Sequence, residues 1–338
     1  MTPDPGTWHT LRLACREPFD GQALLRFLAA RAIPAVEEVS PGRYARTVRV
    51  PGGGSGIIEL VPPPVPGDGD EGQPGHAGHR GQAGQRGRGD DAQVLLRARI
   101  TGLRGTGQVV SRCRRLFDLD ADPEPIDAAL AADEVLAPLV AAHRGLRVPG
   151  AYDGFELAVR AVVGQQVSVA AASTLAGRLA ARHGTGLGSQ AAGPLTVLFP
   201  RPAELADADL SGLGLTTRRQ VTLRALAAAC AAGRLSLEPG ADPEETAAPL
   251  VELPGVGPWT VAYIMMRAAG DPDAFPGSDL GLRRAMARLG CEPGHAGRWR
   301  PWRAYAAVHL WTALAEPSPA PTARARAQAV MPAHLAAT

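Results

Sequence analysis

Two predicted helices meet in the stretch Leu253-Pro254-Gly255-Val256-Gly257-Pro258-Trp259-Thr260. Apolar spacing predicts that one helix ends at Leu253, and the two glycines after it predict a tight turn. Pro258 suits the first turn of a second helix, where its missing N–H is no loss. Gly255 and Gly257 permit positive φ and the close approach of a ligand. The free N–H groups of such a turn would form a phosphate site.

This turn alone does not distinguish a binding site from an ordinary connector between two helices. A dinucleotide-binding turn is disfavoured, because no strand is predicted before it and the third glycine of that motif is absent. The sequence contains no Gly-Lys-Ser/Thr, which excludes the phosphate-binding loop of ATPases. The distinction therefore depends on the residues downstream of the turn.

An acidic residue, Asp279, stands at the entry to the next predicted helix, 22 residues after Gly257. Alone, it would be interpreted as a helix N-cap. Its surroundings favour a function, because the segment 280–303 holds six arginines and one acid, and seven of the 15 aromatic residues lie within 259–311. Arginines interleaved with aromatic rings are typical of nucleic-acid binding or of a pocket for an extruded base, although a helical core also uses aromatic residues.

The N-terminal part predicts a small α/β domain. Leu11–Ala14 and Arg46–Val50 alternate with the period of a strand, and Gln22–Ala32 has the spacing of a helix. Residues 66–92 contain nine glycines and no large apolar residue, so they predict a flexible insertion. A strand resumes over 94–100, which places the insertion within a hairpin.

From about Gly107 onward the spacing is helical, with Gly and Pro at nearly every junction. The sequence predicts an α+β fold, in which a small mixed antiparallel-sheet domain (1–116) precedes an all-α body of two lobes (117–316), and a disordered tail (317–338). The predicted helices cover Gln108–Leu116, Ile126–Ala142, Gly154–His183, Ala203–Leu210, Thr217–Gly233, Thr246–Leu253, Pro258–Ala269, Leu280–Leu289 and Pro301–Leu314.

Composition excludes several classes of chemistry. All 35 basic residues are arginine, so a Schiff base on a side-chain amine is excluded. The four cysteines form no Cys-x-x-Cys, which disfavours a zinc ribbon or an iron–sulfur cluster. Apolar runs are too short for a membrane span, and no secretory signal begins the chain. We expect a cytoplasmic protein without a redox cofactor or a catalytic metal.

The stretch from Leu253 to Asp279 resembles the helix–hairpin–helix motif, Gly/Pro-rich loop and Asp of the base-excision DNA glycosylases. The resemblance is closest to the bacterial inducible 3-methyladenine DNA glycosylases (the AlkA type) and covers about residues 10–315, apart from the Gly-rich insertion. The other matching segments are 27–32, 44–46, 111–119, 150–156, 160–170 and 301–311.

The resemblance implies roles for five residues of a base pocket. Asp279 would be the catalytic carboxylate, which stabilises the positive charge that develops on the sugar. Trp259, Tyr263 and Trp311 would form an aromatic pocket for an extruded cationic base, with Phe27 of the front domain as a further member. Tyr263 lies four residues after Trp259, so both face one side of a helix.

Further residues match DNA contacts. Gly255, Gly257 and Thr260 would hold a phosphate 3′ of the lesion, and the resemblance also implies a monovalent cation on the hairpin carbonyls. Gln166 stands where the relatives place a leucine wedge that fills the gap left by the extruded base. Strand-cutting relatives carry a lysine where this chain has Trp259, which implies a monofunctional enzyme without lyase activity.

The implied function is hydrolytic removal of alkylated bases, such as 3-methyladenine and 7-methylguanine, from duplex DNA by a monomer located at the bacterial nucleoid. Two alternatives remain. A glycosylase for deaminated or oxidised bases would have a base-specific polar pocket. A non-catalytic helix–hairpin–helix module would bind DNA and keep binding after Asp279→Asn.

Overall fold

The computed structural model describes residues 7–64, 92–101, 105–238, 243–292 and 294–315. The predicted insertion lies outside these residues except for Ala92, which begins a strand, and the predicted tail lies outside them entirely. Within the described ranges, no helix combines the length and the apolar character needed to cross a bilayer.

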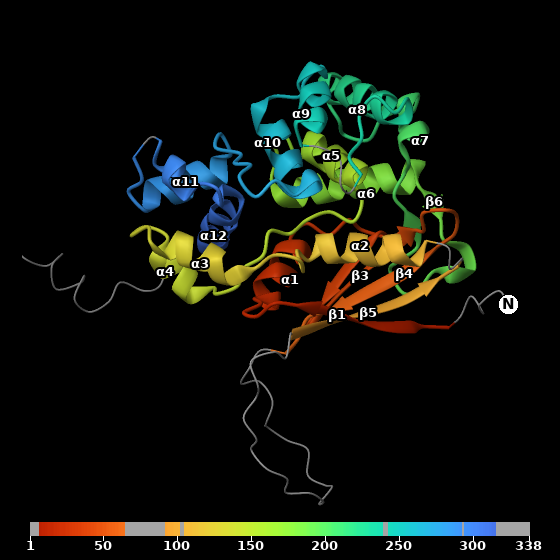
Figure 1. The fold of residues 1–338 in the computed structure, drawn as a ribbon. Helices are drawn as coiled ribbons and strands as arrows, with labels where there is room; N and C mark the ends of the chain where they lie inside the picture. Colours follow the sequence, from red (N-terminus) through yellow and green to blue (C-terminus); the bar gives the residue numbers. More distant parts are fainter. Residues whose placement is uncertain (1–6, 65–91, 102–104, 239–242, 293, 316–338) are drawn as a thin grey trace, which may run out of the picture.

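The N-terminal part is a five-stranded sheet in the order β1-β5-β4-β3-β2, and every neighbouring pair is antiparallel. The pairing of β4 with β5 confirms that the Gly-rich segment joins two strands of a hairpin. Helices α1 and α2 contribute apolar side chains to the same core as this sheet (Figure 1). The bounds are β1 His9–Cys15, α1 Gly21–Ala29, β2 Glu37–Ser40, β3 Arg43–Arg49, β4 Ser55–Val61, β5 Ala92–Ile100 and α2 Thr106–Leu116.

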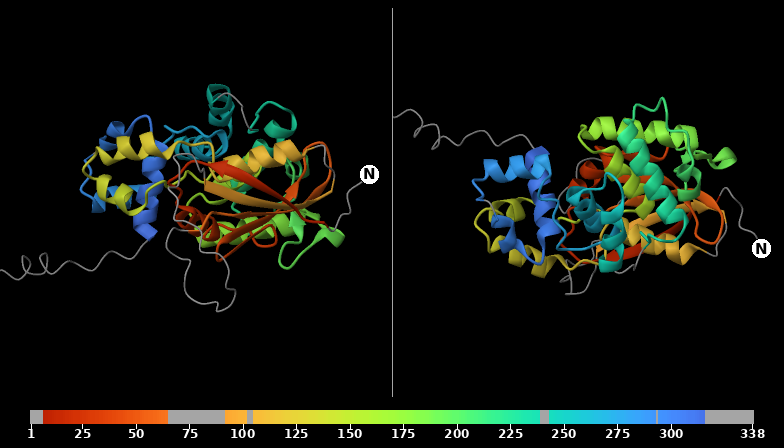
Figure 2. Two further views of the ribbon diagram at one scale, coloured as in Figure 1. Left: turned by 60° about the horizontal axis from the view of Figure 1, so that its bottom comes forward. Right: turned by 90° about the horizontal axis from the view of Figure 1, so that it is seen from above.

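The remaining chain forms two helical lobes, which the views of Figure 2 separate clearly. One lobe joins helices from before and after the other in the sequence: α3 Pro123–Ala131, α4 Ala137–Ala142, α11 Leu280–Arg288, η3 His295–Trp299 and α12 Arg303–Ala315. The other contains α5 Gly154–Val163, α6 Val169–His183, β6 Thr185–Gly186, η1 Gly188–Gln190, β7 Val197–Leu198, α7 Pro202–Ala206, α8 Thr217–Ala231, α9 Pro243–Glu252, α10 Pro258–Ile264 and η2 Met265–Ala269.

Two helices that the spacing predicts as continuous are each broken in two. The segment Ile126–Ala142 divides into α3 and α4, and Gly154–His183 divides into α5 and α6. The apolar spacing continues across each break because the helices on both sides pack into one core. The second break has a local cause in Ser168, whose side chain accepts from the Ala171 N–H and caps α6.

A buried ion network joins the sheet domain to the helical body. Arg46 of β3 lies 2.5 Å from the Glu156 carboxylate on α5, and Arg160 of α5 lies 2.8 Å from Glu37 on β2. The Tyr44 hydroxyl donates to Glu37 over 2.6 Å. All four charged side chains are largely buried, so removing one partner would leave an uncompensated charge. The network therefore fixes the sheet domain, and α1 with it, against α5.

We expect a pH-dependent contribution to stability from His309 of α12, which is 2% exposed and whose Nδ1 has no hydrogen-bond partner in the part of the chain that the structure describes. Burial lowers its pKa from 6.5 to about 4. Between these values the unfolded chain holds a proton that the folded protein lacks. The titration of His309 therefore costs no stability above pH 6.5. As the pH falls from 6.5 towards 4, it lowers the free energy of unfolding, by about 1.4 kcal/mol for each pH unit.

Urea unfolding midpoints across this pH window measure the effect. His309→Leu is expected to make the midpoint less sensitive to acid than that of the wild type. Equal pH profiles for the two proteins would contradict the assignment, whatever the absolute stability of the variant.

Candidate functional site

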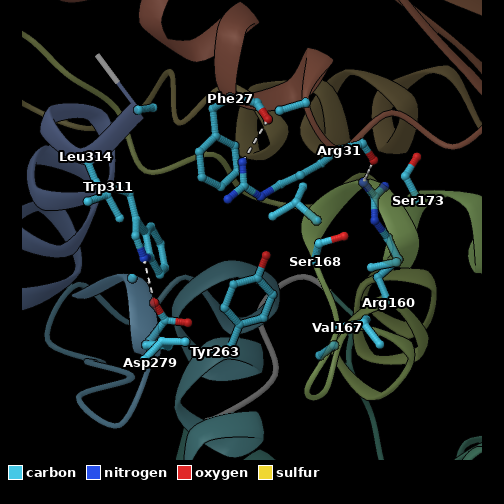
Figure 3. A pocket seen from close by; sticks show the side chains of 18 of the residues that line it. Phe27, Arg31, Arg160, Val167, Ser168, Ser173, Tyr263, Asp279, Trp311 and Leu314 are labelled. Carbon is cyan, nitrogen blue, oxygen red and sulfur yellow. Dashed lines mark hydrogen bonds between the residues drawn. The ribbon is translucent and has the colours of Figure 1, made fainter. Parts of the chain in front are cut away.

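A cavity of about 660 Å³ lies where α1 meets the two helical lobes. Its aromatic side chains come from three distant parts of the chain: Phe27 from α1, Trp259 and Tyr263 from α10, and Trp311 from α12. Figure 3 shows Phe27, Tyr263 and Trp311 around this space. Asp279 lies in its wall at the entry to α11. The sequence-predicted pocket residues are therefore brought together around one space.

The four aromatic rings form a continuous row, in which each ring contacts the next. Trp259 and Tyr263 stack with their centroids 5.3 Å apart and their planes at 17°. Trp311 meets Tyr263 at 6.2 Å, edge to face, and meets Phe27 at 6.1 Å. The spacing of four residues along α10 thus puts both rings on one side of the helix, as the sequence predicts, and the structure stacks them.

Asp279 is both the N-cap of α11 and a member of the cavity wall. Its Oδ1 accepts from the Leu282 backbone N–H at 3.0 Å and from the Trp311 indole at 3.0 Å. Its Oδ2 accepts from the Trp259 indole at 3.2 Å. The two interpretations of this residue are therefore compatible, because the cap holds the carboxylate still while both oxygens stay at the cavity. Among the described residues that line the cavity, Asp279 supplies the sole carboxylate.

The hairpin between α9 and α10 uses its two glycines differently. Gly255 has φ +79°, and a Cβ there would lie 2.3 Å from the Thr222 hydroxyl. Gly257 has φ −103° and is the N-cap of α10, so it does not use the positive φ that a glycine permits. It can stay extended because Pro258 already sets the helical direction. A Cβ on Gly257 would meet no heavy atom within 4 Å, which leaves this side of the hairpin open.

The loop between α5 and α6 carries two glutamines with different orientations. Gln166, the predicted wedge, is exposed and has φ +55°, an uncommon conformation outside glycine. Gln165 points the other way, and its Nε2 donates to the Gly255 carbonyl and to the Thr260 hydroxyl, each at 3.0 Å. Thr260 is 2% exposed, so its hydroxyl is engaged inside the protein rather than free at the surface.

Gln165 is a residue that the sequence analysis missed. Its amide joins the loop of Gln166 to the hairpin, so the two predicted DNA-contacting elements are held at a fixed spacing. A glutamine in a segment with continuous helical spacing gives no sign of this role. The visible signal was Ser168, a capping residue in the middle of that segment.

Two arginines were also missed, one buried (Arg267) and one half-buried (Arg31). Arg267 is 3% exposed and donates to the Tyr263 hydroxyl at 2.7 Å, while the Arg31 guanidinium lies 3.7 Å from the Phe27 ring centroid. Burial raises the pKa of Tyr263, but Arg267 and Arg31 outweigh it, and the pKa is lowered overall. In a sequence, an arginine on an amphipathic helix is expected at the surface, so neither was singled out.

Two family models match the chain. The AlkA N-terminal domain matches residues 10–153, and the HhH-GPD superfamily of base excision DNA repair proteins matches residues 159–297. The DNA-3-methyladenine glycosylase 2 of Escherichia coli is 33% identical over 87% of this chain and 94% of its own length. The chain belongs to the HhH-GPD superfamily of base excision DNA repair proteins.

Other members of the HhH-GPD superfamily extend the comparison. A Mycobacterium tuberculosis relative, described as a probable bifunctional transcriptional activator/DNA repair enzyme AlkA, is 43% identical over 91% of this chain. The chain spans 58% of that relative's length. A solved 3-methyladenine DNA glycosylase from Archaeoglobus fulgidus has the same fold, with a TM-score of 0.69 over 90% of this chain and 97% of its own at 20% identity.

Alanine substitutions at the two hairpin glycines are expected to have different effects, one on stability and the other on DNA affinity. Gly255→Ala places a Cβ against Thr222 at positive φ, so we expect it to lower the free energy of unfolding by about 1–3 kcal/mol. Gly257→Ala meets no protein atom, so it should unfold like the wild type and lose DNA affinity, because its methyl group projects from the open side of the hairpin. Urea unfolding and duplex binding measure the two effects. Equal destabilisation by both changes would contradict this division.

Gln165→Leu is expected to uncouple the loop from the hairpin without unfolding the protein. It removes two hydrogen bonds, each worth about 1 kcal/mol, so base extrusion should weaken by up to about 30-fold. Fluorescence of 2-aminopurine beside the lesion measures extrusion. Gln220→Leu, which removes a bond to the Leu215 carbonyl, is the matched control. An equal loss of extrusion in both variants would refute a specific role for Gln165.

Proposed function

We propose that this protein is a DNA glycosylase that hydrolyses the N-glycosidic bond of alkylated bases, such as 3-methyladenine and 7-methylguanine, in duplex DNA. The observation that carries the proposal is the Asp279 carboxylate, held by the indole N–H groups of Trp259 and Trp311 at an aromatic cavity. Its DNA-repair relatives are named for the same class of base.

Access to the base requires that it leave the duplex stack. The exposed Gln166 is suited to enter the space that the base vacates, and its left-handed backbone projects it from the α5–α6 loop. The open side of the hairpin at Gly257 would hold the phosphate 3′ of the lesion. Phosphate contacts of this kind set the position of the protein and leave base choice to the cavity.

Thr260 contributes to this site indirectly, through its bond to Gln165. The predicted monovalent cation would bind hairpin carbonyls. Two of these already accept one bond each, Gly255 from Gln165 and Leu253 from the Val256 N–H, and each retains a second lone pair. The residues therefore fit a cation that completes the phosphate site.

The proposed catalysis depends on a negative charge beside the sugar. Cleavage of the glycosidic bond leaves positive charge on the sugar, and an ionised carboxylate beside it stabilises that charge or orients the attacking water. Alkylation makes the purine a cationic leaving group, so the bond breaks without a second acid. One carboxylate in the described cavity wall therefore suffices for this class of base, whereas sugar hydrolases use two.

The proposed enzyme is monofunctional. Lyase activity proceeds through a Schiff base on an amine, and this sequence has no lysine. Trp259 occupies the position where lyase relatives carry theirs, and it is committed to the stack with Tyr263. The expected product is an intact strand with an abasic site, made by a monomer in the bacterial cytoplasm at the nucleoid.

The test compares wild type with Asp279→Asn on methylated duplex DNA. We expect methylpurine release to fall about 10²–10³-fold in the variant. Its fold should persist, because the amide oxygen still caps α11 through the Leu282 N–H. Asp273→Asn, a surface carboxylate paired with Arg300 and Arg303, is the matched control.

Strand breaks that appear only after alkali would support hydrolysis without lyase activity. DNA binding by both proteins without base release from either would favour a binding module or a different lesion, and a panel of deaminated and oxidised bases separates these two.

A further inference from the structure

The hydroxyl of Tyr263 lies between two arginines at the wall of the cavity. Arg267 of η2 donates to its oxygen at 2.7 Å, and Arg31, which follows α1, also hydrogen-bonds to it. Figure 3 shows this hydroxyl turned towards Arg31 and the Phe27 ring. A guanidinium has donors and no acceptor, so the phenol oxygen is the acceptor in both contacts.

The proton of Tyr263 is therefore left without a partner in the protein. A neutral phenol has two lone pairs and one proton, and the two arginines occupy both lone pairs. In the part of the chain that the structure describes, no group accepts a hydrogen bond from this hydroxyl. The neutral phenol thus carries an unpaired donor, whereas the phenolate keeps both contacts and has no donor to satisfy. The local hydrogen bonding favours the ionised form.

The charges that act on the phenol are positive. Arg31 and Arg267 have no carboxylate partner among the described residues, because their hydrogen bonds go to backbone carbonyls and to Tyr263. Arg160 of α5 also acts on the phenol, but two buried glutamates pair with it. Burial raises the pKa of Tyr263, and the facing arginines more than offset this, so the pKa is lowered overall.

The other charged groups of the cavity wall leave this excess of positive charge in place. The Asp279 carboxylate accepts from the indoles of Trp259 and Trp311 and pairs with neither arginine. Arg26 and Arg284 line the cavity with exposed side chains, whose charges solvent and salt screen. While Tyr263 is neutral, a cationic base would therefore enter beside two uncompensated guanidinium groups.

We propose that Tyr263 is a specificity-determining residue whose phenolate, bound between Arg31 and Arg267, is the form that receives an extruded cationic base. The inference rests on the proposed function and deepens it, because it assigns the cavity a second negative charge besides Asp279. The phenolate offsets one of the two guanidinium charges, and its electron-rich ring, stacked on Trp259, attracts a cation. A cationic base in turn favours the phenolate, so ionisation and base binding are linked.

The phenolate acts on capture of the base and takes no part in the bond changes. Tyr263 gives its proton to solvent before the base binds. As the glycosidic bond breaks, its electron pair passes to the base and the positive charge passes to the sugar, where Asp279 stabilises it. A negative charge beside the base thus stabilises the bound substrate and tightens its binding, without raising the rate constant at saturation.

The first measurement follows the near-ultraviolet absorbance of tyrosinate in the whole protein as the pH rises. Burial raises the pKa of the other three tyrosines of the chain, which are Tyr44, Tyr152 and Tyr305. We expect one tyrosine of the wild type to ionise below the ordinary value of 10, and none in Tyr263→Phe.

Two further variants connect this titration to the geometry. Arg31→Met removes one of the two guanidinium groups, so it should move the midpoint to higher pH. Tyr152→Phe is the matched control, because its hydroxyl donates to the Arg49 carbonyl at 3.4 Å and lies outside the cavity. It should titrate like the wild type.

The second measurement is single-turnover release of 3-methyladenine from methylated duplex DNA at increasing enzyme concentration. As the pH rises through the absorbance midpoint, the concentration for half-maximal rate should fall about tenfold in the wild type and stay constant in Tyr263→Phe. The maximal rate constants of the two proteins should agree within about threefold. Arg31→Met should move this pH dependence to its own absorbance midpoint. A duplex with an abasic site offers no base, so both proteins should bind it equally.

Several results would overturn the inference. One is a wild type in which no tyrosine ionises while the duplex remains intact. Another is the same pH dependence of half-saturation in wild type and Tyr263→Phe. Weaker binding of the abasic duplex by Tyr263→Phe would assign Tyr263 a packing role instead. Methylpurine release with a half-saturation that is independent of pH would refute this inference alone, whereas no release at any pH would refute the proposed function itself.

Discussion

The buried ion network between the sheet and α5 is the constraint on which the cavity depends. Arg46, Glu37, Glu156 and Arg160 are largely desolvated, so they are stable together and costly apart. Such a cluster contributes less to stability than to a unique arrangement, because only one docking of the two domains satisfies every charge. That docking brings Phe27 and Arg31 of the front domain into a cavity whose other walls are helices from the body. A sheet domain with a core of its own thus supplies part of the wall of the cavity.

Within the cavity, rigidity comes from shared hydrogen bonds. Asp279 caps α11, and the same carboxylate receives the indole N–H groups of Trp259 and Trp311 from both lobes. The carboxylate and the aromatic rings therefore hold one another in place before any base enters. Preorganisation of this kind lowers the reorganisation needed when charge develops on the sugar. At the hairpin, Gln165 plays the corresponding part by joining the α5–α6 loop to the Gly255 carbonyl.

The sequence correctly predicted features that depend on residues close together in the chain. Spacing of four residues placed Trp259 and Tyr263 on one face of a helix, and the structure stacks them. The pairing of β4 with β5 confirmed a hairpin around the Gly-rich segment. It failed where apolar spacing persists through a break, as between α5 and α6. It also missed Arg31 and Arg267, because burial of a guanidinium depends on neighbours from other parts of the chain.

The sequence alone determined the class of fold, the hairpin and the chemical types available: one carboxylate at a helix start, a group of aromatic residues, and no lysine. These are set by residue type and short-range spacing, which constrain φ, ψ and the face of a helix. Only the tertiary structure decided which side chains share the cavity and that Gln165 turns inward while Gln166 turns outward. It also decided that Arg31 and Arg267 lie beside the aromatic rings, with no carboxylate partner among the described residues. Those outcomes depend on contacts between segments far apart in the chain, such as Gln165 and Gly255, which are 90 residues apart. No local pattern in the sequence encodes the distances or the desolvation of such contacts.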